Sequence, residues 1–241
     1  MVKRGQGRFY NKCTFNYETV NNRPGGRYFQ LKVCEIFTSI QGESSYAGMP
    51  CTFIRMTGCN LRCSYCDTKY AYNEGRELSE EDIIGKVKRY GISLVEITGG
   101  EPLLQKEVFH LIKQLLDEKY KVLIETNGSM NIKDVDKTAV VILDIKTPGS
   151  GMSEKMDLSN LENIKSTDEI KFVVTNRTDY EWSKDIIHKY NLINKCHLLL
   201  SPAYGILLPE DLARWMIKDR LKARLNLQLH KYIFGHERTG I

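Results

Sequence analysis

The sequence has no long apolar run, no internal repeat and no low-complexity tract. Without a continuous apolar stretch of roughly 20 residues, we expect no membrane-spanning helix and no membrane partner. The basic first residues, Met1 to Gly7, lead into no apolar segment of the kind that a secretory signal needs. These absences predict a cytoplasmic protein.

The chain of 241 residues suits one large domain better than two small ones. Its 41% hydrophobic and 27% charged residues are ordinary for a globular protein. The net charge of +5 comes from basic residues that are spread along the chain and mixed with acids, so charge alone does not predict direct nucleic-acid binding. Residues 1–31 are basic, glycine-rich and polar, and we expect a partly disordered N-terminal extension there, followed by a core domain at 32–241.

Apolar runs of strand length alternate with segments of helical periodicity in the core. The predicted strands are Thr52 to Thr57, Leu94 to Thr98, Lys121 to Thr126, Val140 to Ile145, Glu169 to Thr175 and His197 to Ser201. The predicted helices follow the N-cap Ser79 as far as Tyr90, and then cover Gln105 to Lys119, Tyr180 to Tyr190 and Pro209 to Lys222.

This alternation predicts an α/β fold with parallel strands and right-handed crossovers. The short interval 127–139 barely holds a crossover helix, so we expect an incomplete (β/α)6 TIM-like barrel with a reduced helix complement. The last apolar stretch, Leu225 to Phe234, predicts a further strand beside the sheet.

Three of the seven cysteines, Cys59, Cys63 and Cys66, fall within one short loop after the first predicted strand. A secreted disulfide framework does not favour such crowding. The spacing lets one loop present three thiolates to an iron–sulfur cubane, and because ordinary clusters use four cysteines, one iron would keep an exchangeable position. The alternatives are a structural zinc site, for which no nearby Cys or His pair offers a fourth ligand, and three unrelated thiols. The other cysteines are expected to have no chemical role.

Polar and glycine-containing motifs end the next three predicted strands, at residues 98–102, 125–128 and 144–148. Because the carboxyl ends of parallel strands meet at one rim, these motifs are expected beside the cysteine loop. Glycines at such positions let a ligand approach the backbone closely, although a tight strand-to-helix turn uses them equally well.

The C-x3-C-x2-C loop, with an aromatic residue before its last cysteine, resembles the signature of the radical S-adenosylmethionine (SAM) superfamily. The resemblance implies a barrel of the radical SAM type and a 4Fe-4S cluster whose open iron binds SAM. An electron from the cluster then cleaves SAM to a 5′-deoxyadenosyl radical that abstracts hydrogen from a substrate. It implies no certain catalytic side chain, because the radical is generated on SAM. The implied cofactor-binding residues are Tyr65, Cys66, Asp67, Gly99, Gly100, Glu101, Asn127, Lys146, Thr147 and Ser201.

A longer resemblance, from about Val33 to the C-terminus, is to the 7-carboxy-7-deazaguanine synthase family. It is carried by segments 35–43, 47–50, 67–70, 144–152 and 228–234 together with Arg55. It implies conversion of 6-carboxy-5,6,7,8-tetrahydropterin to 7-carboxy-7-deazaguanine with loss of ammonia, in the route to queuosine. It also implies a homodimer, a flavodoxin or ferredoxin as reductant, and Mg2+ held by Thr68. The implied substrate-binding residues are Ile40, Gln41, Gly42, Glu43, Arg55, Thr98, His230 and Lys231.

These residue types suit that substrate. Arg55 can give a carboxylate paired, charge-assisted hydrogen bonds, although a strand-end ion pair is its simpler role. Gln41 offers both a donor and an acceptor to a pterin edge. Two other functions stay open: a different small radical SAM enzyme, such as a glycyl-radical activase, and a non-catalytic zinc or RNA-binding module.

Overall fold

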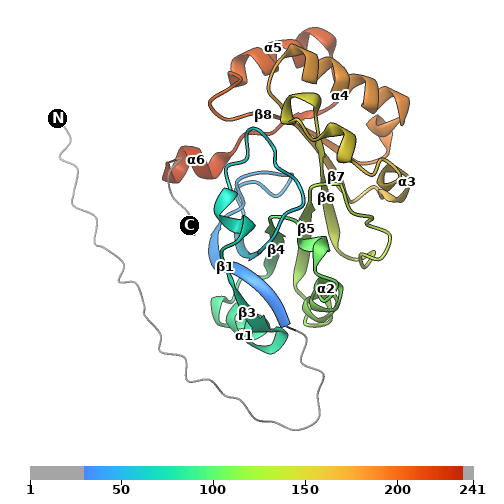
Figure 1. Ribbon diagram of the computed structural model, residues 1–241. Helices are drawn as coiled ribbons and strands as arrows, with labels where there is room; N and C mark the ends of the chain where they lie inside the picture. Colours follow the sequence, from blue (N-terminus) through green and yellow to red (C-terminus); the bar gives the residue numbers. More distant parts are fainter. Residues whose placement is uncertain (1–29, 236–241) are drawn as a thin grey trace, which may run out of the picture.

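The computed structural model describes residues 30–235, whose strands form a single mixed sheet (Figure 1). The strands lie in the order β3-β1-β2-β4-β5-β6-β7-β8-β9. Their bounds are β1 (Gln30–Ile40), β2 (Pro50–Met56), β3 (Arg76–Ser79), β4 (Leu94–Gly99), β5 (Lys121–Thr126), β6 (Val140–Lys146), β7 (Glu169–Val174), β8 (His197–Pro202) and β9 (Arg224–Leu225). The α-helices are α1 (Glu80–Tyr90), α2 (Val108–Asp117), α3 (Asn160–Asn163), α4 (Arg177–Lys189), α5 (Pro209–Asp219) and α6 (Leu229–Phe234).

All six predicted strands are confirmed as β2 and β4 to β8, which pair in parallel as expected. The predicted helix after Ser79 is confirmed as α1: the Ser79 hydroxyl accepts a hydrogen bond from the Asp82 amide at 3.1 Å. No helix lies between β5 and β6 within the described chain, where the short interval 127–139 left little room for one.

Two strands at one end of the sheet, β1 and β3, were not predicted from the sequence. β1 pairs antiparallel with both β2 and β3, and forms one end of the sheet together with β3. The predicted extension, residues 1–31, is therefore two residues too long, because Gln30 and Leu31 already belong to β1. The rest of that extension, residues 1–29, lies outside the described residues.

The prediction of a strand over Leu225 to Phe234 was wrong for most of its length. Only Leu225 pairs with the sheet, as the second residue of β9, and Leu229–Phe234 forms helix α6. No residue of α6 is buried, so its apolar side chains do not serve the core that the apolar pattern suggested.

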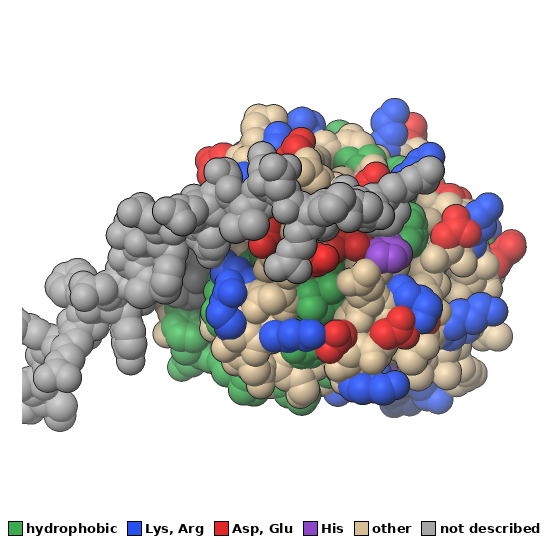
Figure 2. Space-filling view, turned by 90° about the horizontal axis from the view of Figure 1, so that it is seen from below, with side chains coloured by type: hydrophobic (Ala, Val, Ile, Leu, Met, Phe, Trp, Pro, Cys, Tyr) green, Lys and Arg blue, Asp and Glu red, His purple; other side chains and the backbone are tan. Residues whose placement is uncertain are grey.

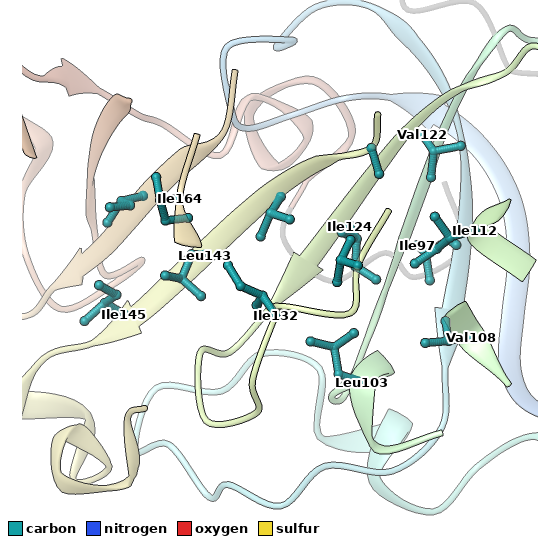
Figure 3. Packing of buried hydrophobic residues seen from close by; sticks show 14 of the residues in the cluster. Ile97, Leu103, Val108, Ile112, Val122, Ile124, Ile132, Leu143, Ile145 and Ile164 are labelled. Carbon is teal, nitrogen blue, oxygen red and sulfur yellow. The ribbon is translucent and has the colours of Figure 1, made fainter. Parts of the chain in front are cut away.

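The main core lies between the outer face of the sheet and the helices. Ile97 of β4 and Ile124 of β5 are fully buried there with Val108 and Ile112 of α2 (Figure 3). Because side chains alternate along a strand, the residues between them face the opposite side. That inner face carries polar side chains, and it forms the site described below.

The charges on the visible surface give little indication of a partner that carries charge of only one sign. Seen from below, Lys and Arg side chains are interspersed with Asp and Glu (Figure 2). No helix within residues 30–235 is both long and apolar enough to span a bilayer.

Candidate active site

A cavity opens on the inner face of the sheet, with about 1550 Å³ of empty space including its open mouth. Of the sequence-predicted site residues, those lining it are Ile40, Gln41, Gly42, Glu43, Arg55, Cys59, Cys63, Tyr65, Cys66, Asp67, Thr68, Thr98, Gly99, Gly100, Asn127, Lys146, Ser201, His230 and Lys231. The fold thus brings residues from nearly the whole described chain into one site.

The three motif cysteines lie together at this cavity as free, partly exposed thiols. Their loop is fixed from two sides. The Ser64 amide and hydroxyl donate to carbonyl oxygens of the segment after β6, at 3.0 and 2.8 Å, and the Asn127 side chain approaches the Cys59 sulfur at 3.7 Å. A loop held in this way can present its thiols without refolding.

The Gly99–Gly100 pair packs directly against the start of the cysteine loop. A Cβ on Gly100 would lie 2.0 Å from the Gly58 carbonyl oxygen, and one on Gly99 would lie 2.3 Å from that of Met56. Gly99 also has φ +144°, a backbone conformation that other residues rarely adopt. Glycine is therefore required here for close packing of two backbones as well as for any ligand that approaches them.

Glu101 and Thr147, both predicted to bind the cofactor, do not line the cavity. The Glu101 carboxylate lies behind the wall, where it accepts hydrogen bonds from the amides of Leu103 and Asn127 at 2.9 and 2.7 Å. Burial raises its pKa to about 7, although these hydrogen bonds oppose the rise. The Thr147 hydroxyl donates to the Val173 carbonyl at 2.8 Å. Both stay predicted cofactor contacts, and in this structure their side chains hold neighbouring loops in place.

Lys171 of β7 joins three carboxylates of the cavity wall and was missed in the sequence. Its ammonium lies 3.0 Å from Glu43 and 3.3 Å from Asp144, and it also pairs with Glu125. Burial acts to lower the pKa of Lys171, but the carboxylates raise it well above its usual value. Asp144 has a second cation, Lys146, at 2.9 Å, and this pairing and Lys171 together hold its pKa below the usual range against the effect of burial.

Glu96 of β4 is the second residue that sequence reasoning missed. It is only 4% exposed, and its carboxyl group accepts a hydrogen bond from the Gln41 side chain. Burial, reinforced by the nearby Glu125, raises the pKa of Glu96 well above its usual value. A charged residue inside an otherwise apolar strand, as at Glu96 and Lys171, was the signal that could have revealed both.

Asp67 connects the cysteine loop to the C-terminal segment. It accepts hydrogen bonds from the Thr68 hydroxyl at 2.9 Å and from the Lys231 ammonium at 2.5 Å. Burial acts to raise the pKa of Asp67, but Lys231 and these hydrogen bonds bring it below the usual range. His230 packs over Gly42, where a Cβ would lie 2.0 Å from the imidazole Nδ1. Burial lowers the pKa of His230.

Three buried oxygens at the cavity lack a hydrogen-bond partner within the described part of the protein: Ser39 Oγ, Tyr65 Oη and Asp144 Oδ1. An unsatisfied buried polar atom costs about 1–3 kcal/mol, so these atoms fit a polar ligand in the cavity.

The thiols fit a cluster better than a single zinc ion. With Zn–S bonds of about 2.3 Å, tetrahedral zinc needs its sulfur ligands within about 4 Å of one another. Within residues 30–235 no group of three or more His, Cys, Asp or Glu side chains is arranged to hold a single metal ion. A cubane places its thiolates on separate irons, so it does not need such convergence.

Comparisons with known proteins agree with this geometry. The model of the radical SAM superfamily matches residues 53–146, which contain the cysteine loop and the strands β2 and β4 to β6. The chain is 41% identical to the 7-carboxy-7-deazaguanine synthase of Koribacter versatilis, over 88% of this chain and all of the relative. It is 42% identical to that of Chlorobaculum tepidum, over 88% of this chain and 97% of the relative.

The fold also matches a solved structure. The crystal structure of QueE from Escherichia coli superposes with a TM-score of 0.70 at 26% identity, covering 83% of this chain and 95% of that one. The protein is therefore a radical SAM enzyme with the α/β fold of that superfamily, and the superfamily's 4Fe-4S cluster and SAM are its cofactors. The chain belongs to the 7-carboxy-7-deazaguanine synthase family.

Proposed function

We propose that this enzyme converts 6-carboxy-5,6,7,8-tetrahydropterin to 7-carboxy-7-deazaguanine with loss of ammonia, in the route to queuosine and other 7-deazapurines. The observation that carries the proposal is the lining of one cavity, where three free thiols and a glycine turn come together with Arg55 and Gln41. The glycyl-radical activase alternative is not favoured by the relatives, which carry the synthase name.

Cys59, Cys63 and Cys66 are proposed to hold the cluster, with Gly99, Gly100 and the side chains named below to hold SAM. When bound, these cofactors supply a reduced cluster and a hydrogen-abstracting adenosyl radical. The chain's own part is to bind and orient these cofactors: the glycines let a ligand approach the backbone closely, and the Tyr65 hydroxyl has no partner among residues 30–235. The remaining proposed SAM contacts are Cys66, Asp67, Asn127, Lys146 and Ser201.

For the substrate, the cavity combines cationic and neutral polar groups. Arg55 suits the carboxylate, and Gln41 and Thr98 suit a pterin edge. The Thr98 hydroxyl is already oriented, because it donates to Glu125 at 2.9 Å. Other proposed substrate contacts are Ile40, Gly42, Glu43, His230 and Lys231. Because Glu96 has a raised pKa and Lys171 offsets Glu125, the net negative charge that an anionic substrate meets is reduced.

Mg2+ is proposed to bind at Thr68, beside the cysteine loop. Magnesium prefers oxygen ligands and keeps several waters, so a single hydroxyl at a cavity wall is a suitable contact. Asp67, hydrogen-bonded to that hydroxyl, would fix its orientation.

The proposal extends to assembly and architecture. Exposed apolar side chains near the C-terminal end of the described chain support a homodimer; they are Tyr204, Ile206, Leu208, Leu227, Tyr232 and Ile233. The open order of the sheet, with its parallel strands around the cavity, supports an incomplete (β/α)6 barrel within residues 30–235. A flavodoxin or ferredoxin in the cytoplasm would supply the electron.

The test is anaerobic turnover. Iron-loaded, reduced protein is incubated with SAM and the carboxytetrahydropterin, and the products are identified by mass spectrometry together with an ammonia assay. We expect 7-carboxy-7-deazaguanine and ammonia in equal amounts, and a dependence on Mg2+. Cleavage of SAM without any deazapurine would reject the substrate while leaving the radical SAM assignment in place.

A further inference from the structure

Three side chains contact Arg55: Glu35 and Tyr70, which do not line the cavity, and Phe37, which does. Its Nε donates to Glu35 Oε1 at 2.8 Å, and its guanidinium lies 5.8 Å from the ring centre of Phe37 and 5.9 Å from that of Tyr70. Neither Nη1 nor Nη2 has a hydrogen-bond partner within the described chain, and the Arg55 side chain is 17% exposed. Because Arg55 lines the cavity, its free Nη groups are left for a ligand there.

The hydroxyl of Tyr70 completes this arrangement. It donates to the same Glu35 oxygen, also at 2.8 Å, so one carboxylate fixes both the arginine and the aromatic ring beside it. Burial, with Glu35 contributing, raises the pKa of Tyr70, which keeps the phenol protonated as a donor. Phe37 is fixed in turn by stacking on Phe53, with ring centres 5.1 Å apart.

A β-bulge in β1 brings Glu35 to Arg55. The pairing register advances by two residues on β1, from Val33 to Glu35, while it advances by one on β2, from Met56 to Arg55. The extra residue is Cys34, and an extra residue reverses the alternation of side chains along a strand. Before the bulge Val33 packs in the main core.

After the bulge it is Ile36 that packs in the main core, whereas Phe37 and Ser39 line the cavity. Without the bulge, the residue at position 35 would point into the apolar core beneath α1.

We infer that Glu35 and Tyr70 are positioning residues that turn the Nη1–Nη2 edge of Arg55 toward the cavity, so that it grips the substrate's carboxylate with two parallel hydrogen bonds. This inference rests on the proposed function, because it takes a carboxylated pterin as the substrate. The physical reason is geometric. A guanidinium presents its donors in a rigid plane, so occupation of its Nε by Glu35, with the Phe37 and Tyr70 rings close by, leaves the Nη1–Nη2 edge for a bidentate partner.

Removal of Glu35 has opposite expected effects on substrate binding, depending on whether Glu35 positions Arg55 or only neutralises its charge. If Glu35 only neutralised Arg55, then its removal would strengthen the binding of an anion. If Glu35 orients Arg55, its removal weakens the binding of a carboxylate and leaves a pterin without that carboxylate unaffected. The two roles are therefore separated by the sign of the change.

The experiment compares Glu35→Gln, Tyr70→Phe and Arg55→Lys in the iron-loaded enzyme with SAM. Steady-state kinetics and calorimetric binding use 6-carboxytetrahydropterin and the same tetrahydropterin without the carboxylate. The matched control is Glu118→Gln, which breaks an exposed ion pair with Lys88 far along the chain. For Glu35→Gln we expect KM for the carboxylated pterin to rise about tenfold with kcat nearly unchanged, as for a misplaced positioning group.

Tyr70→Phe keeps the ring and should raise KM by a few-fold, whereas Glu118→Gln should change nothing. Affinity for the pterin without the carboxylate should stay the same in every variant. Tighter binding or unchanged KM in Glu35→Gln would overturn the inference, and so would an equal loss for both pterins, which would indicate a merely structural role.

A substrate-free measurement separates this inference from the proposed function. The Nε–H signal of Arg55 in nitrogen-15 NMR of the oxidised enzyme, assigned by its absence in Arg55→Lys, should be protected from exchange and lose that protection in Glu35→Gln. If this holds but the wild type does not distinguish the two pterins, the proposed substrate fails. If the wild type selects the carboxylated pterin but the signal is unprotected, the positioning role fails.

Discussion

Replacing Lys171 by Met removes the one cation shared by three carboxylates of the cavity wall. Asp144 keeps Lys146 at 2.9 Å, so its charge stays compensated. Glu43 keeps the side-chain amides of Gln228 at 2.9 Å and Asn226 at 3.5 Å, and Glu125 keeps a threonine hydroxyl, but neither carboxylate keeps an ion-pair partner among the described residues. Removing one partner of a buried ion pair costs about 3–5 kcal/mol, and we expect a loss of unfolding free energy in that range at pH 7.

The loss should depend on pH in a definite direction. The pKa values of Glu43 and Asp144 are lowered in the folded protein, by Lys171 in both cases and by Lys146 for Asp144, against the effect of burial. A carboxyl group whose pKa is lowered by folding stabilises the protein at pH values above its pKa in the unfolded chain, about 4. That stabilisation disappears as the pH falls through its pKa in the folded protein. In the Lys171→Met variant the uncompensated carboxyl groups instead take up protons more readily. The difference between the two proteins should therefore shrink as the pH falls from 7 to 4.

The assay is urea unfolding followed by circular dichroism at several pH values. The matched control is Lys184→Met, because Lys184 also contacts two carboxylates, Glu181 at 2.9 Å and Asp219 at 2.5 Å, but at the surface. Exposed pairs contribute about 0–1 kcal/mol, so the control should be near neutral. Equal losses in the two variants, or a loss for Lys171→Met that grows toward pH 4, would refute the reasoning.

Three further changes test other parts of the site. Gly100→Ala should lower the unfolding free energy by about 1–3 kcal/mol, because its Cβ would meet a backbone oxygen at 2.0 Å, whereas Gly85→Ala, in α1 with no atom within 4 Å, should stabilise by up to about 1 kcal/mol. Thermal melts of both variants decide this, and a stable Gly100→Ala protein contradicts it. Cys63→Ala should abolish bound sulfide and SAM cleavage with an unchanged circular dichroism spectrum, whereas Cys196→Ala should keep both; cleavage retained in Cys63→Ala would mean that the ligands are misassigned. Thr68→Val should raise the Mg2+ concentration needed for half-maximal turnover, and an unaltered Mg2+ dependence would remove Thr68 from the metal site.

The strands and the cysteine loop could be predicted because their signals are local. Each of the six parallel strands is an apolar run bounded by turn residues, and the loop is defined by spacing within eight positions. β1 was not predicted, because the bulge at Cys34 interrupts the alternation that identifies a half-buried strand. β3, of four residues, is too short and too charged to give a pattern.

The charged interior was harder to predict than the rim. Glu96 and Lys171 lie inside buried strands. The role of a single charged residue in such a strand cannot be predicted until the neighbouring strands are known. Their partners, Gln41 and Glu43, come from a loop far away in the sequence, so no local pattern links them. The same holds for Leu229–Phe234, where apolar composition predicted a strand but the segment forms a helix with no buried residue.

The central proposal is that Cys59, Cys63 and Cys66 hold a cluster with one open iron beside the glycine turn. The most direct measurement is iron and acid-labile sulfide per chain after anaerobic reconstitution, together with the electron paramagnetic resonance spectrum of the reduced protein before and after SAM is added. We predict about four of each ion per chain and a spectrum that changes on addition of SAM. Zinc without sulfide, or a spectrum that SAM leaves unchanged, would contradict the account.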